Sequence, residues 1–394
     1  MRVCLLTPEF LPTWGGVGTY TYNVARGLRD RAEVHVVTSG HGADDVAAVA
    51  PEGVQVHTIL PDGAHDGGLG LSFQLAVLRR LPALCRTHRF DIVHANHAYM
   101  SDLLVRMRRL RARRALTVHT TLGTQVLGTL RADGGVPRDG RERSIERWRL
   151  LFGGIERRYL RQTPAMIFVS RWVRDHATAR YRLTPRVAAV IPNGVDMKPL
   201  ADGTPLGGDD REDDRPMLLF AGRLLALKGI DTLLKAMVRL DAHVRLVLAG
   251  PGDPSPWTSY ADGLGLDRDR YEFLGPVPYP MMPSLYRSAD AVVLPSFSES
   301  CPMVALEAMA CGTPLIAASA GGVAEIVQDG ETGWLFPPGD VDALVGRIET
   351  VLSDPIRARQ TTARARTWVK EHASIERMAD RTLEFYDAVC GEAS

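Results

Sequence analysis

The 394-residue sequence lacks the marks of a secreted, disulfide-built or membrane-spanning protein. Its five cysteines are scattered and include no Cys-x-x-Cys pair, which argues against a disulfide framework or a zinc site. No apolar run reaches the roughly 18 residues that a membrane-spanning helix needs. The amino-terminal segment MRVCLLTPEF has no small-residue cleavage site of a signal peptide. We therefore expect a cytoplasmic protein without a metal site.

Three common kinds of functional site are also missing from the sequence. The arginine clusters have no interleaved aromatic residues and no known nucleic-acid motif, so we expect no nucleic-acid partner. The glycine turn after the first apolar run reads GGxG rather than GxGxxG, which disfavours a nicotinamide cofactor. No Ser-His-Asp arrangement with elbow glycines is present.

Lysine is absent from the first half of the chain, and the net charge of +1 conceals an asymmetry. Residues 1–195 contain 28 Arg against 16 Asp plus Glu, whereas residues 196–394 contain 19 Lys plus Arg against 30 Asp plus Glu. This division predicts two domains with different partners. The clusters at residues 106–114 and 138–149 are interpreted either as a solvated helix face or as a surface for an anionic acceptor or acidic lipids.

Short apolar runs alternate with amphipathic stretches along both halves of the chain. This pattern predicts parallel sheets with crossover helices, that is, two Rossmann-like doubly wound α/β units in tandem. Residues 196–215 are rich in Asp, Gly and Pro, so we expect them to link the units. Ligands of such sheets bind beyond the carboxyl ends of the strands, and two facing units would form a cleft.

The most informative stretch is ESCPMVALEAMACGTP, residues 299–314. Pro302 suits a helix start and Gly312 suits the helix end, so we expect a helix from about 302 to 311. The first N–H groups of such a helix bind phosphate well. Glu299 and Glu307 stand on either side of this helix start and suit sugar hydroxyls. The stretch therefore predicts a nucleotide-sugar site.

Two further loops carry residues that fit the same ligand. Arg223 and Lys228 lie five residues apart after the first strand of the second half, where two cations could hold a diphosphate. Gly15 and Gly16 precede a predicted helix and allow the backbone to approach a phosphate or a sugar. By themselves, both features also fit an ordinary surface loop.

Histidines end two strands of the first half. His119 follows one strand, and His94 and His97 follow the preceding strand and compete for the same role in ligand binding. A metal site at His94 and His97 is weakly supported, because no acidic or cysteine partner lies nearby. The Asp-x-Asp at residues 267–269 is interpreted as a loop rather than a metal site.

Together these motifs resemble the large retaining glycosyltransferase family 4, which has the GT-B fold of two Rossmann-like domains facing across a cleft. The resemblance covers nearly the whole chain through GGVGTY, VHTT, FVS, IPNGVD, GRLLALKG, LGPVPYPMMPSLYRSADAVVLPSFSES and CPMVALEAMACGTPLIAASAGGVAEIV. It implies an acceptor-binding domain at residues 1–195, completed by a helix at about 373–394, and a donor-binding domain at residues 216–372.

The resemblance also implies a role for each matching residue. Arg223 and Lys228 would bind the donor diphosphate, Glu307 the ribose hydroxyls, and Glu299 the transferred sugar. Other implied donor contacts are Gly15, Gly16, Val277 (to the base), His119 (near the reacting carbon), and Cys301, Pro302, Met303 and Val304 at the helix start. No metal or other cofactor is expected, because the family needs none.

The implied activity is transfer of a sugar from a nucleoside diphosphate sugar, UDP-sugar above all, with retention at the anomeric carbon. The segment at residues 123–149 is interpreted as an arginine-rich mobile loop on the acceptor side. The acceptor stays open among a phosphorylated sugar, a lipid-linked sugar at the membrane, and a small aminocyclitol or other natural product. Two departures from the family are noted: Ser300-Cys301-Pro302 replaces Gly-Phe-Gly, and Trp14 stands where α-glucan synthases carry lysine. The rivals are a non-hydrolysing sugar-nucleotide epimerase and a non-catalytic nucleotide-sugar-binding subunit, with contact to a membrane surface as an alternative location.

Overall fold

The computed structural model describes residues 1–11, 15–39, 49–60, 71–96, 100–107, 110–132, 136–202 and 214–391. These residues form two compact units. Unit 1 comprises Met1–Leu122, Arg149–Gly194 and Ile375–Ser394, and unit 2 comprises Gly123–Trp148 and Val195–Ser374. Trp14, His97 and most of the predicted linker lie outside the described residues.

Unit 1 is built on a seven-stranded parallel sheet with the order β3-β2-β1-β4-β5-β6-β7. All its strand pairs are parallel, as the buried apolar runs predict. The strands are β1 (Arg2–Leu6), β2 (Glu33–Thr38), β3 (Gln55–Thr58), β4 (Ile92–Ala95), β5 (Arg113–Val118), β6 (Ala165–Phe168) and β7 (Val187–Val190).

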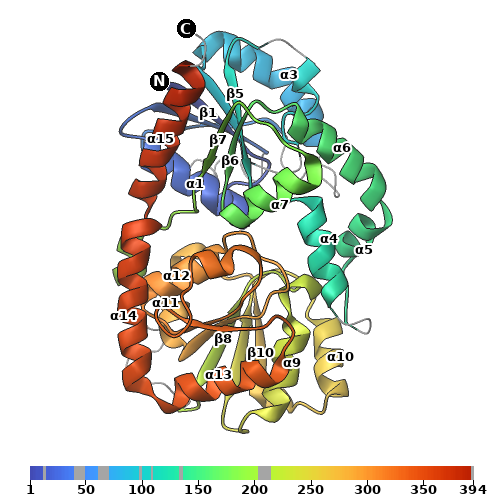
Figure 1. Ribbon diagram of the computed structural model, residues 1–394, viewed down its shortest axis with the longest axis vertical. Coiled ribbons are helices and arrows are strands. Elements are labelled where there is room, and N and C mark those ends of the chain that lie inside the picture. Colours follow the sequence, from blue (N-terminus) through green and yellow to red (C-terminus); the bar gives the residue numbers. More distant parts are fainter. Residues whose placement is uncertain are drawn as a thin grey trace. The chain divides into compact units, whose positions relative to one another are not determined.

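Helices cover both faces of this sheet, and each face has its own apolar core (Figure 1). α1 (Gly16–Leu28) and the C-terminal α15 (Ile375–Gly391) pack on one face. α3 (Leu71–His88) packs on the other face. The unit also contains η1 (Val105–Met107), α6 (Arg149–Arg161) and α7 (Arg171–Tyr181). The last helix of the chain therefore completes the fold that the first strand begins.

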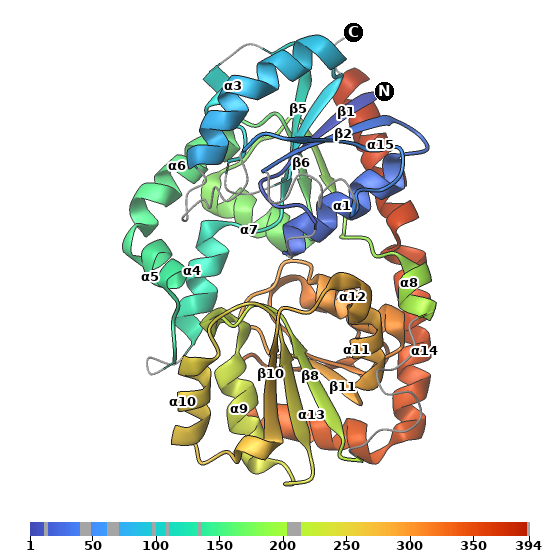
Figure 2. The ribbon, with the colours of Figure 1, turned by 180° about the vertical axis from the view of Figure 1, so that it is seen from behind.

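Unit 2 is built on a six-stranded parallel sheet with the order β10-β9-β8-β11-β12-β13. The strands are β8 (Met217–Ala221), β9 (Arg245–Ala249), β10 (Tyr271–Gly275), β11 (Ala291–Leu294), β12 (Leu315–Ala318) and β13 (Trp334–Phe336). α9 (Ile230–Arg239) and α13 (Val341–Ser353) pack together over one face (Figure 2).

α12 (Met303–Cys311) contacts three helices of unit 2, namely α8 (Met197–Asp202), α11 (Met282–Ser288) and α14 (Pro355–His372). The remaining elements of the unit are α4 (Leu122–Arg131), α5 (Gly140–Arg147), α10 (Ser255–Gly263), η2 (Ala226–Lys228), η3 (Arg268–Arg270), η4 (Tyr279–Met281) and η5 (Gly321–Glu325). α12 ends as the sequence predicts, because Gly312 takes the left-handed conformation with φ +77°.

Residues 123–149 are not the loop that we expected from the sequence. They contain most of α4 and all of α5, and Gly123–Trp148 belongs to unit 2. β7 also escaped the analysis, because its residues are small and only partly buried. No described helix is both long enough and apolar enough to cross a membrane.

Candidate functional site

Two loops meet at the carboxyl ends of the adjacent strands β8 and β11. Phe297 N, after β11, donates a hydrogen bond of 2.9 Å to Leu227 O, after β8. Gly229 has φ +70°, and a Cβ there would lie 2.0 Å from Pro295 O. Because only glycine fits this left-handed position against a backbone oxygen, the two loops have one mutual arrangement. This is the sheet edge at which ligands bind in doubly wound folds.

Lys228 and Glu299 form the polar centre of these loops. Lys228 Nζ lies 2.6 Å from Glu299 Oε1, and Ser296 Oγ donates to the same oxygen over 2.7 Å. The Glu299 side chain is 9% exposed and that of Lys228 is 24% exposed. An ammonium group has three N–H donors, so Lys228 can bind Glu299 and phosphate oxygens together.

Arg223 lies in the same loop as Lys228. It follows Gly222, and its carbonyl accepts a hydrogen bond of 2.8 Å from Leu225 N. The arginine is partly buried. The loop is packed closely against β9, since a Cβ on Gly250 would lie 1.9 Å from Gly222 O. A rigid loop with two cations suits an anionic ligand.

The helix after Glu299 begins at Met303, one residue later than expected. Pro302 is its N-cap residue and supplies no side-chain hydrogen bond. The first recorded helical bond is Leu306 N to Pro302 O at 3.4 Å, so the N–H groups of Met303 and Val304 stand before the helical ladder. Cys301 and Pro302 are buried beside this helix start.

Glu307 lies on α12 and is 4% exposed. Its Oε2 accepts a hydrogen bond of 2.7 Å from the hydroxyl of Tyr286 on α11. Burial raises the pKa of Glu307 to about 7, against the lowering effect of the Tyr286 hydroxyl. The carboxyl therefore keeps its proton to a higher pH than an exposed glutamate does.

Val277 follows β10, two strands away from β8 in the same sheet. It is partly buried, and the preceding Gly275 accepts a hydrogen bond of 2.8 Å from Gly250 N. The predicted base contact thus stands at the same sheet edge as Lys228 and Glu299.

Sequence reasoning missed Glu142, which is buried on α5. Its carboxylate accepts hydrogen bonds from Ala226 N at 3.4 Å and Leu227 N at 3.3 Å. Burial raises the pKa of Glu142 above its usual value. α5 therefore supports the turn that carries Lys228. Tyr286 and Ser296 were also not predicted from the sequence, although Ser296 lies only three residues before Glu299.

The backbone of Glu299 is held by η5. Gly322 N donates to Glu299 O over 2.9 Å. Gly321 has φ +61°, and a Cβ there would lie 2.0 Å from Glu299 O. Any side chain at position 321 would therefore displace Glu299.

Gly321→Ala is expected to lower turnover at least tenfold, because it moves the Glu299 carboxylate away from Lys228. Steady-state kinetics of the purified variant measure the effect. Gly265→Ala is the matched control, since Gly265 also has a positive φ (+75°) but a Cβ there has nothing within 4 Å. Equal loss of turnover in both variants would mean that backbone strain alone is responsible.

In unit 1, Gly15 and Gly16 stand at the start of α1. Gly15 is the extended N-cap residue with φ −172°, and a Cβ on Gly16 would meet nothing within 4 Å. α1 has 13 residues, and the first N–H groups of a helix of this length favour an anion.

His119 follows β5 and packs edge-on against the Tyr20 ring with a centroid distance of 4.5 Å. Its buried Nε2 has no hydrogen-bond partner among the described residues. Burial lowers the pKa of His119 to about 3, so the imidazole is neutral at physiological pH. A neutral ring can exchange hydrogen bonds with a hydroxyl but does not carry a positive charge.

His94, the rival of His119, is a core residue. Its Nδ1 lies 2.7 Å from the Tyr386 hydroxyl, and its Nε2 lies 2.7 Å from Thr117 Oγ1. Both ring nitrogens are therefore engaged within the fold. The Asp-x-Asp segment is a surface turn, in which Asp269 pairs with Arg215, and Arg268, between the two aspartates, pairs with Asp262.

Two doubly wound α/β units, with parallel sheets of seven and six strands, are typical of the GT-B fold. Residues 14–198 match the model of Glycosyltransferase Family 4, and residues 209–368 match that of Glycosyl transferases group 1. The chain belongs to glycosyltransferase family 4, as the sequence predicts, and is a glycosyltransferase that uses a nucleotide-sugar donor.

Curated relatives span nearly the whole chain. A D-inositol 3-phosphate glycosyltransferase of Geodermatophilus obscurus is 31% identical over 414 residues, covering 96% of this chain and 86% of the relative. An alpha-maltose-1-phosphate synthase of Mycolicibacterium smegmatis is 26% identical over 409 residues, covering 99% of this chain and 100% of the relative.

Solved structures confirm the fold. Sucrose-phosphate synthase of Thermosynechococcus elongatus has a TM-score of 0.82 at 22% identity and covers 100% of both chains. HepE of Anabaena, solved with UDP-glucose, has a TM-score of 0.74 at 21% identity and covers 98% of this chain and 100% of its own.

Proposed function

We propose that the chain transfers a sugar from a UDP-sugar to an acceptor hydroxyl with retention at the anomeric carbon. The observation that carries the proposal is the Lys228–Glu299 pair of 2.6 Å, four residues before the start of α12. A cation, a carboxylate and a helix start at one sheet edge match the diphosphate and the sugar of such a donor. The structure of HepE with UDP-glucose supports the choice of nucleotide.

In the proposed reaction, the bond between the anomeric carbon and the diphosphate oxygen breaks as the acceptor oxygen bonds to the same carbon. The acceptor proton passes to the departing phosphate oxygen on the same face of the sugar, which gives retention. Arg223, Lys228 and the N–H groups of Met303 and Val304 stabilise the negative charge that grows on the diphosphate. These groups lie in unit 2. No step requires a metal ion.

We propose that Glu307 binds the ribose hydroxyls of the donor and that Val277 contacts its base. The carboxyl oxygens of Glu307 can accept hydrogen bonds from hydroxyls. Cys301 and Pro302 are proposed to line the sugar. From unit 1, we propose Gly15 and Gly16 as backbone contacts and His119 as a neutral contact to the transferred sugar.

The proposed acceptor is a phosphorylated polyol or sugar. Both curated relatives carry a phosphorylated polyol or sugar in their names. Residues 1–195 have a formal charge of +12, from 28 Arg against 16 Asp plus Glu, which attracts an anion. A flat response of the Michaelis constant to ionic strength would count against this acceptor class.

Incubation with a panel of UDP-sugars, with and without phosphorylated polyols, tests the function. A transferase releases free UDP in step with acceptor consumption. An epimerase would interconvert donors without any acceptor, and a non-catalytic subunit would bind the donor and release no UDP. Either of these two results would overturn the proposal.

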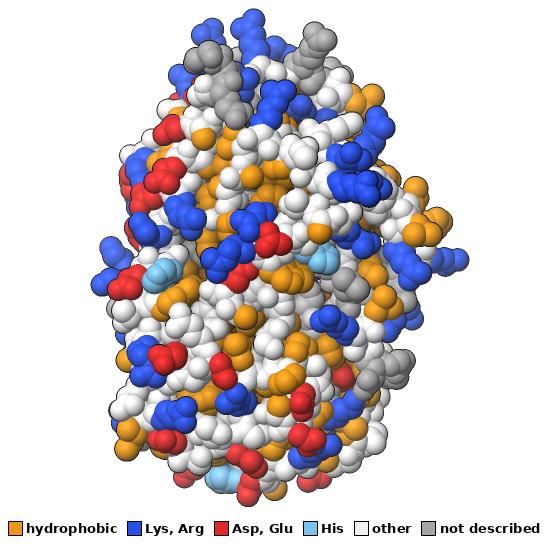
Figure 3. Space-filling view, in the orientation of Figure 1, with side chains coloured by type: hydrophobic (Ala, Val, Ile, Leu, Met, Phe, Trp, Pro, Cys, Tyr) orange, Lys and Arg blue, Asp and Glu red, His pale blue; other side chains and the backbone are white. Residues whose placement is uncertain are grey.

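Contact with an acidic membrane surface is a second proposal for unit 1. Leu150 and Leu151 on α6 are 85% and 56% exposed, and Arg157 and Arg158 on the same helix are exposed. Hydrophobic and basic side chains lie next to one another at the right-hand edge of the molecular face in Figure 3, where α6 lies in Figure 1. Exposed apolar groups among arginines are typical of interfacial helices.

Replacing both Leu150 and Leu151 with serine is expected to reduce binding to anionic vesicles severalfold, because apolar insertion is lost. Co-sedimentation with phosphatidylserine vesicles measures the bound fraction of the wild type and of the variant. Leu71→Ser is the control, because Leu71 is an exposed leucine on α3 (61% exposed). Equal vesicle binding by the wild type and the α6 variant would contradict this proposal.

A further inference from the structure

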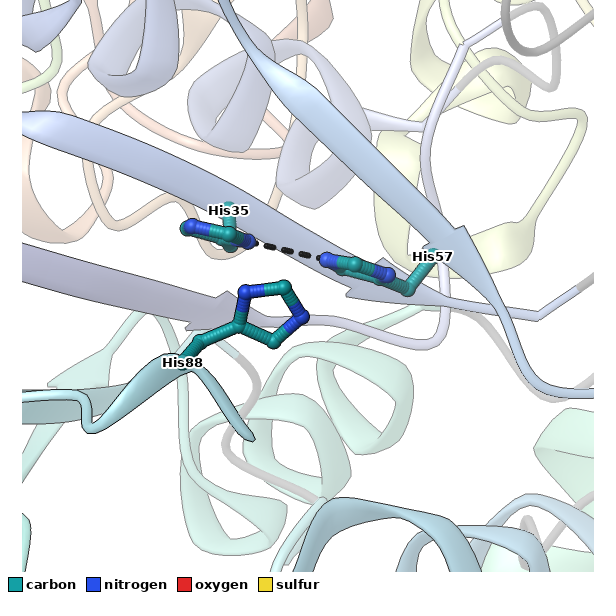
Figure 4. Close-up of side chains that lie close together, drawn as sticks. All are labelled: His35, His57 and His88. Carbon is teal, nitrogen blue, oxygen red and sulfur yellow. Dashed lines mark hydrogen bonds between the residues drawn. The ribbon is translucent and has the colours of Figure 1, made fainter. Parts of the chain in front are cut away.

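Three histidines from separate elements lie together in unit 1 (Figure 4). His35 is on β2, His57 is on β3 and His88 ends α3. Each offers one ring nitrogen, and these three atoms all lie within 4.8 Å of one another. His35 is buried, and the other two are partly buried, so an ion could reach the cluster from one side.

The sheet register explains why His35 and His57 meet. His35 pairs with Gln55, and Val37 pairs with His57, so the two histidines stand two positions apart on adjacent parallel strands. Side chains two positions apart share a face of the sheet. α3 covers this face, and its last residue, His88, packs at 4.5 Å between ring centroids from His35. The ring of Phe90 stacks on that of His88, with a centroid distance of 5.6 Å.

Glu33 fixes the tautomer of His35. The Glu33 Oε1 lies 3.0 Å from His35 Nε2. The other oxygen of Glu33 binds Arg2 at 3.0 Å. Because an ionised carboxylate only accepts, His35 Nε2 carries the proton and Nδ1 carries the lone pair. A carboxylate on the far nitrogen is the usual support of a metal-ligating histidine.

His57 supplies a second ring nitrogen, which becomes a ligand once its proton moves to the other nitrogen of the ring. His35 Nδ1 lies 2.9 Å from His57 Nε2. His35 is buried and His57 is partly buried, and burial disfavours the charged form of an imidazole. The charged or titratable groups near the rings of His35 and His57 are Glu33, Arg2 and His88. Neutral imidazoles are preferred ligands of zinc, nickel and copper ions.

We propose that His35, His57 and His88 bind one divalent transition-metal ion of the zinc type, with water completing the coordination. Two imidazole nitrogens on tetrahedral zinc lie roughly 3.3 Å apart, so the His35–His57 contact of 2.9 Å must lengthen. The two rings are nearly coplanar, with an interplanar angle of 2°, so they must also turn for both lone pairs to converge on one ion. Binding replaces this hydrogen bond. The proton on His57 Nε2 is exchanged through water to Nδ1, so no net proton is released.

The ion would join β2, β3 and α3 rather than take part in sugar transfer. α3 ends just before β4 begins, so His88 lies toward the amino end of that strand, whereas His119 follows the carboxyl end of β5. We therefore expect Zn²⁺ to raise the thermal stability of the chain. The inference does not depend on the proposed function.

The test uses untagged, chelator-treated protein titrated with Zn²⁺ by calorimetry and followed by thermal unfolding. We expect one ion per chain and a higher melting temperature. His57→Gln and His88→Gln should each weaken binding at least tenfold, since an amide can keep a hydrogen bond but is a poor zinc ligand. Glu33→Gln should weaken binding roughly 10- to 100-fold through loss of orientation. His243→Gln, at an exposed histidine of unit 2, is the control and should bind normally.

A second measurement on the wild type guards against variants that fail to fold. X-ray absorption of the Zn²⁺-loaded protein should show three imidazole nitrogens around the ion. The proposal is overturned if the wild type shows no saturable Zn²⁺ binding, if His57→Gln and His88→Gln bind as the wild type does, or if fewer than three imidazoles surround the ion. The cluster would then be a hydrogen-bonded part of the core.

Discussion

Lys228→Ala is expected to lower the turnover number more than tenfold, and roughly 10²- to 10³-fold if Lys228 acts mainly on the transition state. Its ammonium lies 2.6 Å from Glu299 Oε1, at the sheet edge where we propose the diphosphate to leave. Negative charge on the leaving group is greatest in the transition state, so turnover should fall more than UDP affinity does. Steady-state kinetics and UDP calorimetry measure the two effects separately.

The control is Lys370→Ala, at an exposed lysine of α14 in the same unit. Lys228→Ala also removes a partner of the buried Glu299 carboxylate, so its melting temperature must be measured alongside. Lys228→Arg keeps the charge and should recover part of the turnover. Near-normal turnover of a folded Lys228→Ala enzyme would remove our assignment of the diphosphate site.

Glu307→Ala is expected to weaken UDP binding roughly 10- to 150-fold, because hydrogen bonds to a charged group contribute about 1.5–3 kcal/mol. Calorimetric titration with UDP measures this loss. Glu349→Ala, at an exposed glutamate of α13, is the matched control and should bind UDP normally. Unchanged affinity in the Glu307 variant would mean that the ribose binds elsewhere.

The pH profile gives an independent test of Glu307. Its folded-state pKa of about 7 lies above the ordinary 4.5, so the folded chain holds this proton more tightly than the unfolded chain. The stabilisation that comes from holding this proton on Glu307 is therefore complete below pH 4.5 and is lost as the pH rises through about 7. Glu307→Gln should remove this part of the decline in the free energy of unfolding, as denaturant titrations across the range will show.

The sequence predicted the fold because its signals are local. Buried parallel strands read as continuous apolar runs, and the left-handed Gly312 marks the end of α12. β7 was missed because VAAV is short, small and only partly buried. α5 was missed because its arginine-rich sequence has no clear apolar face, and Glu142 contacts residues 84 and 85 positions away.

The candidate site could be predicted in part, since Lys228, Glu299 and Glu307 lie on motifs with short spacing. Ser296, three residues before Glu299, had a local signal that the analysis did not use. Tyr286 had none, because only the packing of α11 on α12 brings it to Glu307. The three histidines of unit 1 likewise meet only through the register of β2 and β3 and the end of α3.

A crystal structure of this chain with bound UDP would test the proposed donor site most directly. We predict the diphosphate at the start of α12, within hydrogen-bonding distance of Lys228 Nζ and Met303 N, and the ribose hydroxyls on the Glu307 carboxylate. UDP bound away from the carboxyl edge of β8 and β11, or with its diphosphate out of reach of Lys228, would contradict the account.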